Sequence, residues 1–181
     1  MVGPTPLALR PRLLIIVPLT IFVTATTHWM SWEEPIRAHF AGDVASYEKI
    51  ALAAPHFTWP QIEGHVGMWP LHYLVGITAK ATHVPLHVVY YVFAFLVLAA
   101  IVVIVDRLLA DLRVDLPVYA LCMGALLLNP YIFRYLALAP GMINDTAFIA
   151  AVCLTTVGLV ERRLGWVIGA LTVAALTRDV S

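Results

Sequence analysis

The chain has 181 residues, of which 61% are hydrophobic and only 12% are charged, with a mean hydropathy of +0.88. Soluble domains are about 45–50% apolar and about 25% charged, so this composition excludes an ordinary soluble domain and indicates a membrane protein. The formal net charge of +0 gives no electrostatic reason to expect a nucleic-acid partner. Cys122 and Cys153 lie in apolar runs and are expected to be small buried residues rather than a disulfide or a metal pair.

The first apolar run, residues 13–30, carries no charge and is long enough to span a hydrocarbon core about 30 Å thick. Arg10 and Arg12 precede it, and Trp29 lies near its end, where an interfacial aromatic belt is expected. A cleaved signal peptide is the alternative interpretation, because small residues at 24–27 follow the apolar core. We favour a retained membrane anchor.

Residues 31–85 are expected to form an outer loop with juxtamembrane helices. Gly42 followed by Asp43 predicts a helix start, with Asp43 as the N-cap. From there, apolar residues recur at helical spacing on one face, which predicts a short amphipathic helix along the membrane surface. The next apolar stretch, 68–82, is interrupted by polar residues and is too short for a confident span.

Three further apolar stretches follow at 86–105, 117–139 and 141–160, and a shorter run occupies 164–177. The second of these is broken by Asn129-Pro130 and carries Arg134. The predicted fold class is therefore all-α: a polytopic membrane helix bundle of about five to six spans. We expect a single membrane domain over 1–181, with 13–30 as the first span, 31–85 as the outer loop and 86–177 as the remaining spans.

The basic residues predict the orientation of the bundle, because they favour the cytoplasmic side. If residues 68–82 do not cross the membrane, the chain has five spans, its N-terminus is cytoplasmic and six arginines lie on the cytoplasmic side. If residues 68–82 do cross, two of these arginines, Arg107 and Arg113, lie outside. The five-span alternative separates the charges better, and it puts Asp43 and Asp145 at the same outer face. The six arginines are Arg10, Arg12, Arg107, Arg113, Arg162 and Arg163.

The stretch from Gly42 to Gly76 is the most polar part of the chain near a predicted span. Such a stretch is costly beside a bilayer, so it is the first place to look for function. The alternative is an external amphipathic loop whose carboxylates face water. Its acidic residues and histidines are Asp43, Glu48, Glu63, His56, His65 and His72.

Short motifs follow one another in a recognisable order. Asp43 and Tyr47 come first, then PLHYLVGI at 70–77, then Asn144-Asp145-Thr146, and finally AALTRDVS at 174–181. This order resembles the GT-C membrane glycosyltransferases, which use polyprenyl-phosphate sugars and include protein O-mannosyltransferases and bacterial aminoarabinose transferases. In that family a Pro-Leu-x-Tyr-type stretch follows the first outer loop, and an acidic residue begins the helix after the second.

The chain departs from the family pattern in two respects. Met68-Trp69-Pro70 stands where the family has a double proline with a lysine. Family members are also usually more than twice this long, so we expect the N-terminal half of such an enzyme, as a fragment or a degenerate or split member. The resemblance implies transfer at the outer face of a bacterial cytoplasmic membrane, from a polyprenyl-phosphate-linked sugar to an unknown acceptor, among membrane lipids.

The chemistry of such a transfer assigns roles to the polar residues. A carboxylate must take the acceptor's proton, and positive charge or hydrogen-bond donors must hold the leaving phosphate. Asp43 is the expected base, Asp145 is expected to orient the acceptor or share a divalent cation, and Glu63 can do either. Tyr47 either lines the substrate site or packs against the spans. The candidate substrate-binding residues are Arg134, His72, Arg178, Tyr47 and His65.

Two other classes of function fit the composition. A small transporter or channel would use Asp145, Arg134 and the histidines to line a polar path, although the polar residues gather near one face instead of at the midplane. A non-catalytic membrane assembly subunit is the other alternative, and the short length favours it.

Overall fold

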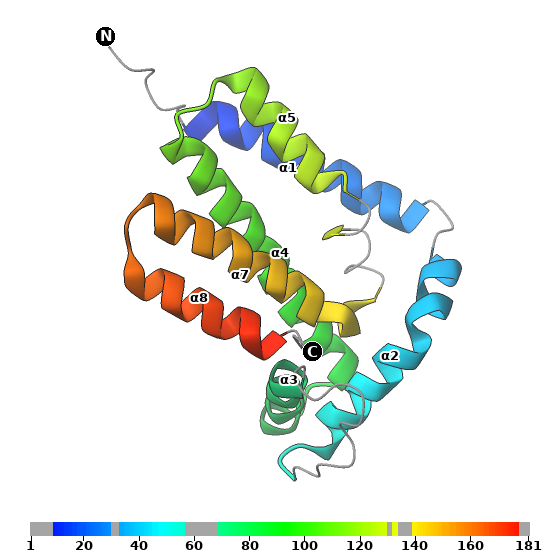
Figure 1. Ribbon diagram of the computed structural model, residues 1–181. Helices are drawn as coiled ribbons and strands as arrows, with labels where there is room; N and C mark the ends of the chain where they lie inside the picture. Colours follow the sequence, from blue (N-terminus) through cyan, green and yellow to red (C-terminus); the bar gives the residue numbers. More distant parts are fainter. Residues whose placement is uncertain (1–8, 30–32, 57–68, 130–131, 134–138, 178–181) are drawn as a thin grey trace.

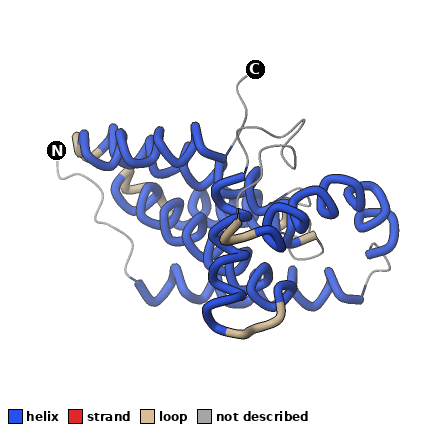
Figure 2. Tube along the Cα trace, turned by 90° about the horizontal axis from the view of Figure 1, so that it is seen from below, coloured by secondary structure: helices blue, strands red, loops and turns tan. Residues whose placement is uncertain are grey.

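The computed structural model describes residues 9–29, 33–56, 69–129, 132–133 and 139–177, and every regular element in these ranges is helical (Figures 1 and 2). The expected all-α fold is therefore confirmed for the described part of the chain. The elements are α1 (Leu9–Trp29), α2 (Glu33–Ala53), α3 (Trp69–Thr82), α4 (Leu86–Asp111), α5 (Leu116–Leu127), the short 3₁₀ helix η3 (Pro140–Met142), α7 (Ile143–Val160) and α8 (Leu164–Thr177).

Two helical segments of the described chain are long and apolar enough to cross a membrane, Leu86–Asp111 and Pro140–Val160. Leu116–Leu127 and Leu164–Thr177 are apolar but shorter. At 1.5 Å per residue, a 12-residue helix such as α5 covers about 18 Å of a hydrocarbon core about 30 Å thick. The number of spans therefore stays a prediction.

The predicted helix start at Gly42 and Asp43 is wrong. α2 runs without a break from Glu33 to Ala53, so Asp43 lies inside the helix and is not its N-cap. Pro35 falls in the first turn, where a missing N–H removes no helical hydrogen bond. Gly42 is tolerated within the helix at a cost of roughly 0.5–1 kcal/mol relative to alanine.

The later helices differ from the apolar runs mainly in their length. α4 continues to Asp111, six residues past the expected end, because its charged last turns remain helical. α5 ends at Leu127 and does not continue to residue 139. This end lies two residues before Asn129, for which the following proline disfavours a helical conformation. α7 begins at Ile143 with Asp145 in its first turn, as expected from the sequence.

Close backbone packing joins α2 to α3. A Cβ built on Gly76 of α3 would lie 2.0 Å from the carbonyl oxygen of Ala51 in α2, so only glycine fits this contact. Ala51 and Gly76 are both buried, beside the buried Val75. In membrane proteins, small residues of this kind let helix backbones approach closely.

α7 packs along both α8 and α4, while α1 lies beside α5 (Figure 1). A Cβ on Gly158 near the end of α7 would lie 3.0 Å from Cγ2 of Val167 in α8, which sets the spacing of this helical hairpin. Ile101, Tyr119 and Met123 are among the fully buried side chains in the helices of the bundle.

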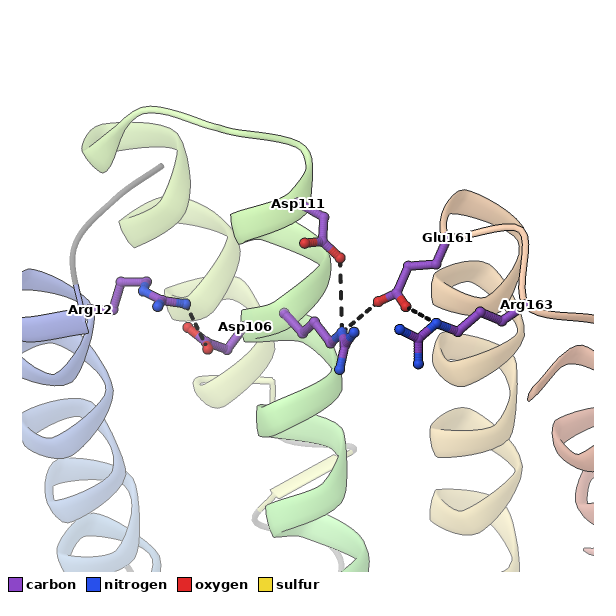
Figure 3. Close-up of polar contacts among 6 residues, drawn as sticks. Arg12, Asp106, Asp111, Glu161 and Arg163 are labelled. Carbon is purple, nitrogen blue, oxygen red and sulfur yellow. Dashed lines mark hydrogen bonds and ion pairs between the residues drawn. The ribbon is translucent and has the colours of Figure 1, made fainter. Parts of the chain in front are cut away.

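One end of the bundle is joined by ion pairs (Figure 3). Arg12 at the start of α1 pairs with Asp106 near the end of α4, with 2.9 Å between Nη1 and Oδ2. The hydroxyl of Tyr119 in α5 donates to the other oxygen of Asp106 over 2.6 Å. Three helices are therefore held together at Asp106.

The same end of α4 is joined to the α7–α8 turn. Glu161 accepts a hydrogen bond from Nε of Arg107 over 2.5 Å, and its other oxygen forms an ion pair with Arg163, 2.8 Å from Nε (Figure 3). Both guanidinium groups also lie over the ring of Trp166, at 5.1 and 4.8 Å from its centroid. We call this set and the Arg12–Asp106 pair the arginine end.

α4 and α7 run in the same direction, since both end at this arginine end. Tyr90 lies near the start of α4, sixteen residues and so about 24 Å along the axis from Asp106. The expected grouping of Arg12, Arg107 and Arg163 at one end is confirmed. The side of the membrane that this end faces stays a prediction.

Candidate functional site

A chain of hydrogen bonds lies around a buried histidine at the opposite end of α4 and α7. His72 of α3 has 0% of its surface exposed. The side-chain amide nitrogen of Asn144 lies 2.9 Å from its Nε2, and the hydroxyl of Tyr90 lies 3.0 Å from its Nδ1. Tyr90 in turn donates to the backbone carbonyl oxygen of Tyr47 over 3.3 Å.

The donors in this chain fix the tautomer of His72. The amide nitrogen of Asn144 can only donate, so Nε2 must accept. The single proton of the Tyr90 hydroxyl is used for the carbonyl of Tyr47, so Nδ1 carries a proton and donates to the Tyr90 oxygen. Four helices, α2, α3, α4 and α7, are thereby linked through one neutral imidazole. We call Asn144, His72, Tyr90 and Tyr47 the histidine network.

Tyr47 stacks on His72 and is affected by both candidate carboxylates. Its ring stacks on the imidazole of His72, with centroids 4.1 Å apart and an angle of 8° between the planes. Burial, together with the smaller effects of the negative charges of Asp43 and Asp145, raises the pKa of Tyr47 to about 12. Both carboxylates therefore act on the same phenol, although they come from different helices.

Packing of η3 against α2 places the start of α7 at this site. A Cβ on Gly141 would lie 3.0 Å from Cγ1 of Val44, so the backbone of η3 directly contacts α2. Tyr47, Ile50 and Met142 belong to one buried cluster across this contact. Asp43 and Tyr47, four residues apart on α2, share a face of that helix.

The structure describes only some of the predicted site residues. The charges of Asp43 and Asp145 both act on Tyr47, and the roles of these three residues stay predictions. His72 is close to them, but it is fully buried and both ring nitrogens bond to protein groups, so it positions its neighbours and is not open to a phosphate. The other predicted site residues lie outside the described ranges: Glu63, His65, Arg134 and Arg178.

Asn144 and Tyr90 were not predicted from the sequence. Asn144 is 2% exposed and adjoins the candidate Asp145, and Tyr90 is 2% exposed in an otherwise apolar helix. Buried polar groups nearly always have hydrogen-bond partners. A buried His72 needs hydrogen-bond partners for both ring nitrogens, and this need could have pointed to further site residues. It does not say which residues supply the hydrogen bonds.

An apolar groove of about 580 Å³ begins next to the histidine network. Leu71 adjoins His72 in the chain, and Ala147 lies one turn after Asn144, so these two lining residues bring the groove to the network. Trp166 lines it toward the arginine end. Most of its wall comes from α4, α7 and α8, including Phe93, Leu96, Val97, Ala100, Leu154 and Ala170.

Within the described residues, no group of three or more His, Cys, Asp or Glu side chains is placed to hold a metal ion. The described part of the site holds two carboxylates that act on one buried phenol, and a neutral imidazole. Comparisons of the chain with protein-family models, with curated proteins and with solved structures find no match.

Proposed function

We propose that this chain acts as a membrane glycosyltransferase that moves a sugar from a polyprenyl-phosphate donor to an acceptor. The observation that carries the proposal is that Asp43 of α2 and Asp145 of α7 act on one buried phenol, Tyr47. They do so near the starts of the two helices that, within the described residues, are long and apolar enough to cross a membrane. Carboxylates in such a place are expected to have a function.

The transfer step assigns one proton and one electron pair. Asp43 takes the proton of the acceptor's hydroxyl or amine as the acceptor atom bonds to C1 of the sugar. The bond between C1 and the phosphate oxygen breaks, and its electron pair stays on the phosphate. Asp145 orients the acceptor for this attack on C1, or it shares a divalent cation with the acceptor.

The apolar groove supports a lipid-linked donor. A polyprenyl chain is a hydrocarbon, and the groove is lined almost wholly by aliphatic and aromatic side chains. It begins beside His72 and Asn144, so a chain lying in it would leave its phosphate near Asp43 and Asp145. Transfer of such a chain from water to an apolar surface is favourable by about 0.8 kcal/mol per buried CH₂.

The histidine network supports the geometry of the site. His72 stacks on Tyr47 and bonds to Asn144, the neighbour of Asp145, so it ties the helices that carry the two carboxylates. Catalytic groups need such support, because errors of about 1 Å in position can cost about 10²-fold in rate. His72 is therefore a positioning residue in this proposal.

Transfer assays in membranes that contain a radiolabelled polyprenyl-phosphate sugar test the proposal. Asp43→Asn should lower transfer by roughly 10²–10⁴-fold, because an amide cannot accept the proton. Asp145→Asn should lower it less if that residue only orients the acceptor. Asp111→Asn is the matched control, because it removes a half-exposed carboxylate from the arginine end.

The two kinds of failure have different meanings. Full transfer by Asp43→Asn would show that another group is the base, and Glu63 would be the next candidate. If the wild-type chain consumes no lipid-linked sugar in these membranes, the proposal fails and a non-catalytic assembly subunit becomes the better interpretation.

A further inference from the structure

A second cavity of about 430 Å³ lies between α2, η3 and the start of α4, beside the histidine network. Its volume falls within the range of about 300–1,000 Å³ that is usual for sites of small molecules. Tyr90 contributes to both the cavity wall and the network. The lining residues are Ala41, Val44, Glu48, His87, Tyr90, Tyr91, Ala139, Pro140 and Gly141.

The described part of the cavity wall carries one carboxylate. Glu48 contributes it, and its charge acts on the hydroxyl of Tyr90. Among the lining residues that the structure describes there is no lysine or arginine, and His87 is the one basic side chain. In the described part of the chain, Glu48 has no hydrogen bond or ion pair with a cationic side chain. An anionic ligand would be repelled here, and a wholly apolar one would remove water from Glu48 without replacing it.

Aromatic side chains complete the recognition surface. Tyr90 and Tyr91 both contribute to the wall, and Tyr91 is 43% exposed and so accessible to a ligand. The faces of aromatic rings attract cations, and this attraction adds to that of a nearby carboxylate. His87 adds a ring nitrogen that can accept an N–H.

We propose that this cavity binds a small molecule through a primary ammonium group, which lies against Glu48 and the exposed ring of Tyr91. Binding of such an amine does not depend on the proposed function. That the bound amine is the acceptor of the transferred sugar is a further step, and this step rests on the proposed function.

Ethanolamine is a suitable probe, and ethylene glycol is its control of similar size without a charge. Saturation-transfer NMR on the full chain in detergent micelles measures both affinities. Ethanolamine should bind at least about tenfold more tightly, because a hydrogen bond between an ammonium group and the Glu48 carboxylate is stronger than one from a neutral hydroxyl. Equal binding of the two probes, or no binding of ethanolamine, would overturn the proposal.

Variants separate the role of each group. Glu48→Gln keeps the shape and should weaken ethanolamine binding by roughly tenfold, whereas Asp111→Asn at the arginine end should leave it unchanged. Tyr91→Leu should weaken binding, and Tyr91→Phe should not, because phenylalanine keeps the ring face. Thermal unfolding of each variant verifies that it is folded. Wild-type affinity in both Glu48→Gln and Tyr91→Leu would contradict the site, whatever the transfer assay shows.

Discussion

The side-chain amide of Asn144 donates to Nε2 of His72 over 2.9 Å and so ties the first turn of α7 to the buried face of α3. The two residues are 72 positions apart in the chain. Since Nδ1 of the same ring reaches Tyr90, the imidazole has hydrogen-bonded partners on two further helices. This contact is the direct link between the start of α7 and the rest of the site.

Asn144→Ala should lower the free energy of unfolding by about 1–3 kcal/mol, because Nε2 of the fully buried His72 loses its donor. Thermal or denaturant unfolding in detergent measures the loss. Thr172→Ala is the control, since Thr172 is exposed and bonds only within its own helix. In a double-mutant cycle with His72→Phe, the two changes should be less costly together than the sum of the single losses. Strict additivity would contradict the link.

Gly76→Ala should separate α2 from α3, because its Cβ would lie 2.0 Å from the carbonyl oxygen of Ala51. Overpacking of this kind typically costs about 1–3 kcal/mol, and backbone cannot move aside as a side chain can. Gly124→Ala is the matched control, since nothing lies within 4 Å of the added Cβ, and it should be neutral or stabilising by up to about 1 kcal/mol. Equal unfolding midpoints for the two variants would refute the close approach.

The raised pKa of Tyr47 predicts a loss of stability at alkaline pH. The phenol loses its proton near pH 10 in the unfolded chain, but at about 12 in the folded one. The contribution of this protonated phenol to the free energy of unfolding is therefore fully present below pH 10 and is lost as the pH rises from about 10 to about 12. Tyr47→Phe, which keeps the ring, should lose less stability across this window in denaturant unfolding. Identical pH profiles would show that Tyr47 does not titrate as described.

Cysteine labelling with a membrane-impermeant reagent tests the expected orientation in intact cells. In a chain without Cys122 and Cys153, a cysteine at Ser46 of α2 should react from outside. One at Leu164, which is 70% exposed at the arginine end, should be protected until the membrane is permeabilised. This follows from the preference of arginines for the cytoplasmic side. The reverse pattern would place the carboxylate pair in the cytoplasm.

The apolar runs of the sequence predict where several helices begin. The starts of α4 at Leu86 and of α7 close to Gly141 follow from hydropathy, and Asp145 falls in a first turn as expected. Hydropathy reports the apolar part of a helix and not its ends, so the last turns of α4 through Asp111 were missed. The start of α2 was misplaced because Gly42-Asp43 resembles a cap, while the real start at Glu33 carries a less distinctive signal.

The sequence pointed to Asp43, Asp145, Tyr47 and His72 of the candidate site, but not to Asn144 and Tyr90. Asp43 and Asp145 stand out because carboxylates are rare in this chain, and both act on Tyr47. The partners of His72 could not be found, because they lie 18 and 72 residues away and their pairing depends on how four helices pack. Local patterns carry no information about contacts at that separation.

The common direction of α4 and α7 also has an electrostatic consequence. The peptide dipoles of a helix add to about half a positive charge at its first turn and half a negative charge at its last. Both positive ends therefore lie at the histidine network, where Asp145 occupies a first turn and a phosphate would be attracted. Both negative ends lie beside Arg107 and Arg163, which compensate them. This pair of helices is thus polarised along its length by its backbone, whereas α1, α5 and α8 begin at the arginine end and their dipoles oppose it.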